Sequence, residues 1–346
     1  MSEIISSDTE TLILTAQKNV QGLIDEVFHH TDEEHAVVVY DLGSVLSKVL
    51  SEAYKYCLPD ATFFNFEECS HDEILEALAS LQESDFVVLI QSTNFRLNAF
   101  RIRVELFKRK IKVLEHPHLG RMADEEAPVY IDALAYDAEY YRGVGHALQT
   151  KIDAARSGVL DSGGELLVYD SSFEPAKLNI GDYEQMTNTG GQFPIGEVFT
   201  EAKDLRALNG RAKIAIFSDV TYRINKPQIP ITLIIQKGQV VGCENSTPEF
   251  DEILSLIREG EDVVWVRELG FGLNKAFSTN RTVKDTGSYE RMCGVHLSLG
   301  AKHGMYGKEG FKRGDGKFHI DVFADTHSFT LDDEVIYQDG AWTVHY

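Results

Sequence analysis

The chain has 346 residues, of which 43% are hydrophobic, and it carries a formal net charge of −22. This acidic excess excludes a protein that binds nucleic acid through its phosphates, because such binding requires clustered basic side chains. Neither a basic-then-apolar leader nor an apolar run of about 18 residues occurs, so no secretory signal and no membrane span are predicted. The four cysteines show no CxxC spacing, and we expect reduced thiols in a cytoplasmic protein.

The first part of the chain alternates short apolar strands with amphipathic helices. Strands are predicted at residues 36–41, 61–65, 86–90 and 111–115, and helices at 42–56, 72–81 and 94–110. This alternation is typical of a parallel sheet with right-handed crossovers. No nucleotide site is predicted, because the first strand-to-helix turn, Asp41 to Ser44, has one glycine in place of GxGxxG, and no GxxxxGKS or GxxxxGKT occurs.

The second part of the chain is predicted to be rich in short strands. Residues 125–155 read as a mostly helical link, and glycines in residues 157–164 then break the pattern. We therefore expect an α/β fold with a Rossmann-like parallel-sheet domain at residues 1–157 and a β-rich mixed domain at residues 158–346. Elements expected in the latter are strands at 165–170, 212–218, 229–236, 240–243, 263–266 and 318–323, a helix at 247–260, a two-residue hairpin turn at 237–238 and a terminal hairpin at 329–340.

Five side chains of metal-ligand type lie in this second part: Glu197, Glu268, His296, His319 and Asp321. His319 and Asp321 are two residues apart between apolar neighbours, so on a strand they share one buried face. A buried carboxylate beside an imidazole needs a partner or a metal ion. Glu197 and Glu268 adjoin glycines, which let a backbone bend around an ion. The alternatives are a solvated charge at 197, a loop glutamate at 268, a core histidine at 296, and a surface histidine at 319 with a turn aspartate at 321.

Further polar residues are candidates for catalysis. Glu197 and Glu290 are predicted to take part, although Glu290 also fits the charged face of a helix or loop. His303 and Tyr306 lie among glycines, which indicates either a mobile loop that donates a hydrogen bond to a developing oxyanion or a polar surface loop. Basic groups and histidines at residues 29–30, 108–110 and 116–118 are assigned to the surface or to supporting positions.

The set of candidates predicts a hydrolytic site. Three carboxylates and two imidazoles can hold two divalent ions that share one carboxylate, and such a pair lowers the pKa of a water molecule and polarises a carbonyl. This chemistry hydrolyses a peptide or an amide. A free amine on the substrate would be attracted by an acidic cleft.

At these residues the chain resembles the M29 metallo-aminopeptidases. The resemblance rests on Pro194-Ile-Gly-Glu-Val-Phe-Thr200, Glu268-Leu-Gly-Phe-Gly-Leu-Asn274, Gly294-Val-His-Leu-Ser-Leu-Gly300 and His319-Ile-Asp321, in the family's order and approximate spacing. The first half of the chain is similar only as an α/β domain. The resemblance implies a pair of zinc, cobalt or manganese ions on Glu197, Glu268, His296, His319 and Asp321, a peptide or small amine-bearing substrate, and a homodimer.

Two departures from the family pattern leave other functions open. The family has a tyrosine where this chain has His303, with Tyr306 three residues later, and Tyr289-Glu-Arg291 replaces its usual Asp-Glu. Ring-cleaving dioxygenases of the same superfamily use one iron, and His296, His319 and Asp321 would form an Fe(II) triad. Those enzymes have a histidine at the position of Glu268, so Glu268 favours the hydrolase. The third alternative is a peptide-binding protein of a biosynthetic pathway with a weakened site, which the His303 change favours.

Overall fold

The computed structural model describes residues 7–97, 101–184, 186–221, 223–301 and 318–346. The chain divides into two compact units, one of residues 1–138 with 181–195 and the other of residues 139–180 with 196–346. The predicted α/β fold class is confirmed, because the first unit holds a parallel sheet and the second a large antiparallel one. The boundary predicted between residues 157 and 158 stays a prediction, since compactness alone does not show which part folds by itself.

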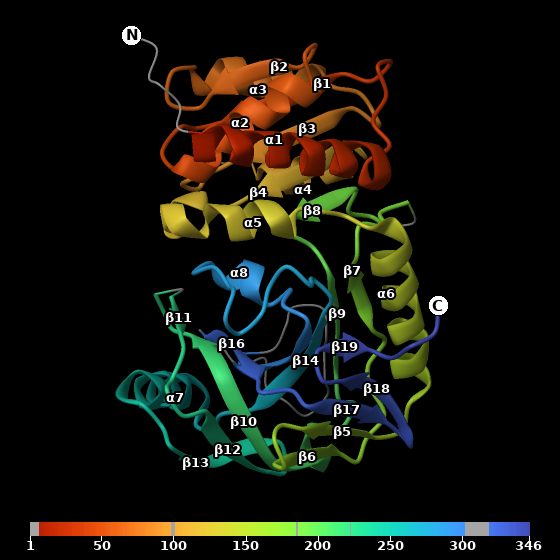
Figure 1. Ribbon diagram of the computed structural model, residues 1–346, viewed down its shortest axis with the longest axis vertical. Coiled ribbons are helices and arrows are strands. Elements are labelled where there is room, and N and C mark those ends of the chain that lie inside the picture. Colours follow the sequence, from red (N-terminus) through yellow and green to blue (C-terminus); the bar gives the residue numbers. More distant parts are fainter. Residues whose placement is uncertain (1–6, 98–100, 185, 222, 302–317) are drawn as a thin grey trace. The chain divides into compact units, whose positions relative to one another are not determined.

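Five parallel strands form the sheet of the first unit, in the order β2, β1, β3, β4 and β8 (Figure 1). Val37 and Val87 of this sheet pack with Ile74 of α3 and Leu106 of α4 in one buried core. The strands are β1 (Ala36–Tyr40), β2 (Thr62–Asn65), β3 (Phe86–Ile90), β4 (Lys112–His116) and β8 (Gly190–Gln192); the helices are α1 (Ser7–Gly22), η1 (Leu23–Val27), α2 (Val45–Cys57), α3 (His71–Ser80), α4 (Ile102–Lys108), η2 (Leu119–Arg121), η3 (Asp124–Glu126) and α5 (Ala127–Ala133).

Helix α4 is shorter than the helix predicted at residues 94–110. Residues 94–96 have no regular structure, and the backbone N–H of Phe95 donates instead to the side-chain oxygen of Gln91 at 2.8 Å. A side chain that captures a backbone donor in this way competes with a helical hydrogen bond. The apolar periodicity around residue 94 therefore reflects the burial of Phe95 and Leu97 in the core rather than a helix.

His116 is fully buried at the end of β4, so of the surface and supporting positions predicted for it, the surface is excluded. Tyr130 donates its hydroxyl to the carbonyl of Phe193 at 2.9 Å, which leaves its oxygen to accept from Nδ1–H of His116 at 2.9 Å. Nε2 of the same ring then accepts from the hydroxyl of Tyr54, also at 2.9 Å. The imidazole is held neutral between two hydroxyl groups, and burial lowers its pKa from 6.5 to about 3.

The buried His116 makes the stability of the first unit depend on pH. Between pH 6.5 and about 3 the unfolded chain binds a proton that the folded chain does not, so the stabilisation present above pH 6.5 is lost as the pH falls. We expect the free energy of unfolding to change by about 1.4 kcal/mol per pH unit through this group. Urea denaturation at about pH 5 and about pH 6 gives the free energy of unfolding at each pH. The difference between the two values should be correspondingly smaller for His116→Gln. His345→Gln is the control, because His345 is exposed. An equal change in the free energy of unfolding with pH for both variants would contradict the prediction.

The second unit is built on one antiparallel sheet, which contains fourteen strands among the described residues. Its main path runs β19-β18-β17-β5-β6-β10-β16-β15-β14-β9-β7, and β11, β12 and β13 attach beside β10 (Figure 1). The strands are β5 (Gly158–Asp161), β6 (Leu166–Tyr169), β7 (Lys177–Asn179), β9 (Glu197–Glu201), β10 (Leu208–Ser218), β11 (Ile224–Asn225), β12 (Ile231–Gln236), β13 (Gln239–Glu244), β14 (Val266–Gly272), β15 (Gly294–Gly300), β16 (His319–Ala324), β17 (Ser328–Leu331), β18 (Glu334–Gln338) and β19 (Ala341–Trp342).

Local signals in the second unit act as the sequence predicts. Lys237 and Gly238 both have positive φ, at 49° and 75°, and join β12 to β13 in a two-residue hairpin. The side chain of Thr247 accepts from the backbone N–H of Phe250, and Pro248 is the first residue of α7 (Pro248–Glu261). The remaining helices are α6 (Ala138–Ala154), η4 (Leu205–Ala207) and α8 (Thr286–Tyr289).

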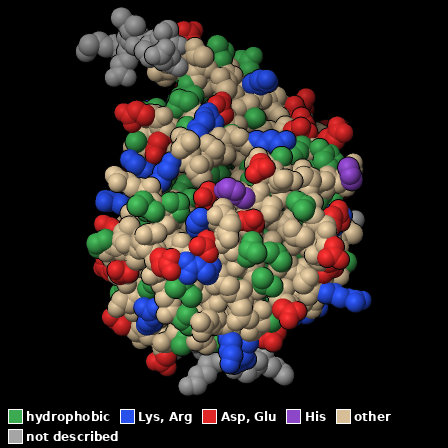
Figure 2. All heavy atoms as spheres, turned by 60° about the horizontal axis from the view of Figure 1, so that its bottom comes forward, with side chains coloured by type: hydrophobic (Ala, Val, Ile, Leu, Met, Phe, Trp, Pro, Cys, Tyr) green, Lys and Arg blue, Asp and Glu red, His purple; other side chains and the backbone are tan. Residues whose placement is uncertain are grey.

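Charged side chains are scattered over the surface. On the face in Figure 2, Asp and Glu are spread among Lys and Arg. Exposed ion pairs such as Lys55 with Glu52, at 2.8 Å, contribute little to stability because water screens them. A search of the described helices finds none long and apolar enough to cross a membrane.

Candidate metal centre

Four neighbouring strands of the second unit, β16, β15, β14 and β9, bring the five predicted ligands to one face of the sheet. Directly opposed residues of antiparallel strands share a face. The register pairs Glu197 with Gly272, His296 with Gly270, and Asp321 with Ser298. Since every second residue of a strand lies on the same face, Glu268 and His319 join the other three there. The sheet thus gathers side chains that are more than 100 residues apart in sequence.

The gathered side chains form two overlapping sets. Glu197, Glu268 and His296 are here called the first ligand group, and Glu268, His319 and Asp321 the second ligand group. Within each group one potential ligand atom from every member lies within 4.8 Å of the others. Glu268 belongs to both groups. Their proximity is a structural finding, whereas ligation of an ion by them stays a prediction.

Imidazole nitrogen atoms and carboxylate oxygen atoms of this cluster face one another. His296 Nε2 lies 3.2 Å from Glu197 Oε1 and 3.5 Å from Glu268 Oε1, and His319 Nε2 lies 3.2 Å from Asp321 Oδ1. By strict geometry, neither ring nitrogen of His296, nor Glu268 Oε2, nor Asp321 Oδ1 has a hydrogen-bond partner among the described residues. Unsatisfied buried polar atoms are costly, and a cation between them would remove that cost. Mixed carboxylate and imidazole donors fit zinc, cobalt, manganese or iron(II).

His319 is oriented by the backbone. Its Nδ1 lies 3.1 Å from the carbonyl oxygen of Ala301, which can only accept, so Nδ1 carries a proton and Nε2 is the ring atom that faces Asp321. A carbonyl that fixes the tautomer of a histidine is a common support behind metal ligands. The His319 side chain is 31% exposed, whereas that of His296 is fully buried.

The charge of the carboxylates dominates the electrostatics. Burial lowers the pKa of His296, but Glu197 and Glu268 outweigh this and raise it to about 10. Burial likewise lowers the pKa of His319, and Asp321 raises it to about 10. Positive charge is therefore favoured at both imidazoles, and a divalent ion and a proton would compete for the same nitrogen atoms.

A β-bulge aims Glu268 into the cluster. Leu269 pairs with Leu297 but Val266 pairs with Leu299. The two residues between them on β14, Arg267 and Glu268, therefore lie opposite a single residue, Ser298. The backbone N–H of Glu268 donates to Ser298 Oγ at 3.0 Å, which satisfies a donor that the bulge would otherwise leave unpaired. The strand predicted at residues 263–266 ends too early, because β14 runs from Val266 to Gly272 and Glu268 lies inside it rather than in a loop.

Gly270 of β14 leaves space for the side chain of His296. A Cβ atom built at residue 270 would lie 2.0 Å from Cε1 and 2.1 Å from Nε2 of His296. The imidazole therefore lies against the bare backbone of β14, a position that no larger residue at 270 permits. The sequence predicts that this glycine lets the backbone bend around an ion, and the structure shows that it lets the His296 ring approach the strand.

An arginine that sequence analysis did not select lies at the edge of the cluster. Arg291 follows α8, and its Nη1 lies 2.8 Å from Glu197 Oε2 and 2.8 Å from Glu290 Oε2. Its side chain is 11% exposed and that of Glu290 is 21% exposed. Burial and the nearby Asp321 raise the pKa of Glu290 well above its ordinary value. In the sequence, the one feature that marks Arg291 is that residues 289–291 depart from the M29 pattern described above.

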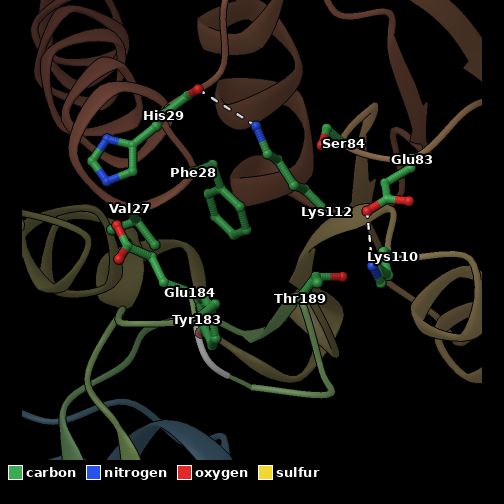
Figure 3. A pocket seen from close by; sticks show the side chains of 10 residues that line it. All are labelled: Val27, Phe28, His29, Glu83, Ser84, Lys110, Lys112, Tyr183, Glu184 and Thr189. Carbon is green, nitrogen blue, oxygen red and sulfur yellow. Dashed lines mark hydrogen bonds and ion pairs between the residues drawn. The ribbon is translucent and has the colours of Figure 1, made fainter.

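Two other predicted residues, His303 and Tyr306, lie outside the described residues, so their roles stay predictions. A separate pocket of about 280 Å³ in the first unit contains none of the predicted ligands (Figure 3). Its two lysines already have partners: Lys110 pairs with Glu83 at 2.9 Å, and Lys112 pairs with Glu34 at 2.7 Å. We assign no function to this pocket.

The fold and the cluster define a two-unit α/β protein with a candidate metal centre on its antiparallel sheet. No protein-family model and no curated protein matches the sequence. Two solved structures are similar in fold. The 2,5-dihydroxypyridine dioxygenase from Pseudomonas putida KT2440 is 15% identical with a TM-score of 0.61, over 97% of this chain and 97% of that one. AmpT from Thermus thermophilus is 13% identical with a TM-score of 0.59, over 96% of this chain and 99% of that one. These identities establish the fold alone.

Proposed function

We propose that this chain is a metal-dependent hydrolase that cleaves a peptide bond next to a free amine, as an aminopeptidase does. The observation that carries the proposal is the position of Glu268 in both ligand groups. Two sets of nitrogen and oxygen donors with one carboxylate in common suit a pair of divalent ions. The fold of AmpT, an M29 aminopeptidase T, supports the same function.

The residues of the cluster have distinct tasks in this proposal. Zinc, cobalt or manganese ions, when bound, would lower the pKa of a water molecule and polarise the peptide carbonyl. Glu197, Glu268, His296, His319 and Asp321 would hold them. Glu290 would accept a proton from the water oxygen that attacks the carbonyl carbon, and would return it to the nitrogen as the C–N bond breaks. The surrounding carboxylates would attract the free amine of the substrate.

Hydrolysis of matched substrates tests the proposal. Chain purified without chelator is incubated with a set of aminoacyl-p-nitroanilides and with their N-acetylated forms. We expect release of p-nitroaniline from the free amines alone, loss of activity in EDTA, and recovery with Mn²⁺, Co²⁺ or Zn²⁺. Glu290→Gln should lower kcat by about 100-fold or more, the usual effect of removing a general base. Hydrolysis that resists EDTA, or that is equally fast on acetylated substrates, would contradict the proposal.

A mononuclear iron(II) dioxygenase is the second candidate, favoured by the fold shared with 2,5-dihydroxypyridine dioxygenase. Its expected triad, His296, His319 and Asp321, is not one of the two ligand groups that the described residues form. Glu268 lies in both groups, and a second carboxylate at that position favours the hydrolase. Oxygen uptake with a dihydroxypyridine after anaerobic loading with one iron per chain would decide for the dioxygenase. Peptide affinity without turnover would instead indicate a binding protein. The homodimer and the cytoplasmic location stay proposals.

A further inference from the structure

We propose that Arg291 is a built-in cation that makes the two ion positions of the centre unequal. The second ligand group would then bind a divalent ion tightly, and the first ligand group would bind one only weakly. This inference rests on the ligand sites of the proposed function. Its readout is ion binding rather than hydrolysis, so the two can fail separately.

The guanidinium group already occupies a ligand of the first group. Arg291 Nη1 lies 2.8 Å from Glu197 Oε2, while the other oxygen of Glu197, Oε1, lies 3.2 Å from His296 Nε2. Glu197 is therefore divided between a permanent cation and the imidazole. In the part of the chain that the structure describes, neither Glu268 nor Asp321 makes an ion pair with lysine or arginine. The second group thus keeps its carboxylates for an ion.

Arg291 is held at this place from both ends. Its backbone N–H donates to the carbonyl of Ser288 at 3.2 Å, and its own carbonyl accepts from the N–H of Asn274 at 2.8 Å. At the far end of the side chain, Nη1 contacts Glu290 as well as Glu197. Two carboxylates and two backbone hydrogen bonds restrain the arginine, so the guanidinium does not leave the cluster without breaking both ion pairs.

Charge repulsion from Arg291 explains why the two ligand groups would differ in ion affinity. An ion bound by Glu197 would share that carboxylate with the guanidinium, and the two positive groups would repel each other. The Arg291 side chain is only 11% exposed, so water screens this repulsion poorly. An ion in the second group shares no ligand with Arg291. The first position is therefore weakened more than the second.

Titration of the metal-free protein with Mn²⁺ tests this difference in affinity. Binding is monitored by calorimetry and by electron paramagnetic resonance of the free ion. We expect one tight ion and a second that binds about tenfold more weakly or worse, the usual size of coupling between sites. Arg291→Met should tighten the second event by about tenfold, and Arg291→Lys should preserve the difference. Arg211→Met is the matched control, because Arg211 of β10 also bridges two carboxylates, those of Glu165 and Glu244, and neither of these belongs to a ligand group.

Two further variants keep the test decisive if Arg291→Met fails to fold. His319→Ala should remove the tight event, because His319 belongs only to the second ligand group. Glu197→Gln should leave that event unchanged, because Glu197 belongs only to the first. Two equally tight ions in the unmodified chain, or loss of the tight ion in Glu197→Gln, would overturn the proposal. Unequal binding without any hydrolysis would uphold it and reject the proposed function.

Discussion

Glu268→Gln is expected to abolish the binding of divalent ions at both positions, because Glu268 is the one residue common to the two ligand groups. Glutamine keeps the size of the side chain but removes its charge. Loss of a residue that supports a ligand weakens metal binding by about 10 to 100-fold, so loss of a shared ligand should exceed that range. Ion content after dialysis without chelator, measured by plasma emission, gives the result directly.

The stability of the same variant separates a lost ligand from a damaged fold. Without ions, Glu268 compensates the positive charge favoured at His296, whose Nε2 lies 3.5 Å from Glu268 Oε1, so Glu268→Gln should lower the free energy of unfolding. With Mn²⁺ at about 100 times its Kd, the unmodified chain should gain about 2.7 kcal/mol and the variant almost nothing. Glu201→Gln is the control: Glu201 is buried directly opposite Glu268 on β9 but belongs to neither group. A variant that still gains stability from Mn²⁺ would show that Glu268 is not a ligand.

Sequence predicted the local part of this fold well. The alternation of strands and helices in the first unit depends on neighbouring residues, and so do the hairpin turn at Lys237 and Gly238 and the start of α7 at Pro248. The five ligand candidates were recognised because acidic residues and histidines are rare between apolar or glycine neighbours. Their convergence needed the register of four strands that are far apart in the chain, which periodicity does not contain.

Arg291 shows why the remainder could not be predicted. Arginine next to glutamate after a short helix has the local pattern of a solvated charged face, yet both side chains are mostly buried against Glu197. The role of Ser298 could not be predicted from the sequence either, because its side chain accepts from Glu268 only where β14, a different strand, forms a bulge. His116 belongs to the same class, since its two hydroxyl partners, Tyr54 and Tyr130, lie in helices α2 and α5. In each case the deciding partner lies in another element.

Gly270→Ala is expected to destabilise the second unit and to weaken the first ligand group together. The added methyl group would lie 2.0 Å from the ring of His296, which is fully buried. Such overpacking costs about 1–3 kcal/mol and displaces the ring that would bind the ion. Gly242→Ala is the matched control in strand β13, because the nearest atom to a Cβ there is 3.6 Å away, an ordinary contact. Urea denaturation and Mn²⁺ titration measure the two effects.

The double variant Gly270→Ala with His296→Ala tests the cause. If the methyl group acts only by striking the imidazole, removal of the ring should restore part of the lost stability, so the two substitutions should not be additive. Ion binding by the first ligand group should not return, because the ring nitrogen is then absent. Additive losses of stability would show that glycine at residue 270 serves the strand itself. Non-additive losses would show that β14 carries a glycine there so that His296 can lie beside Glu197 and Glu268.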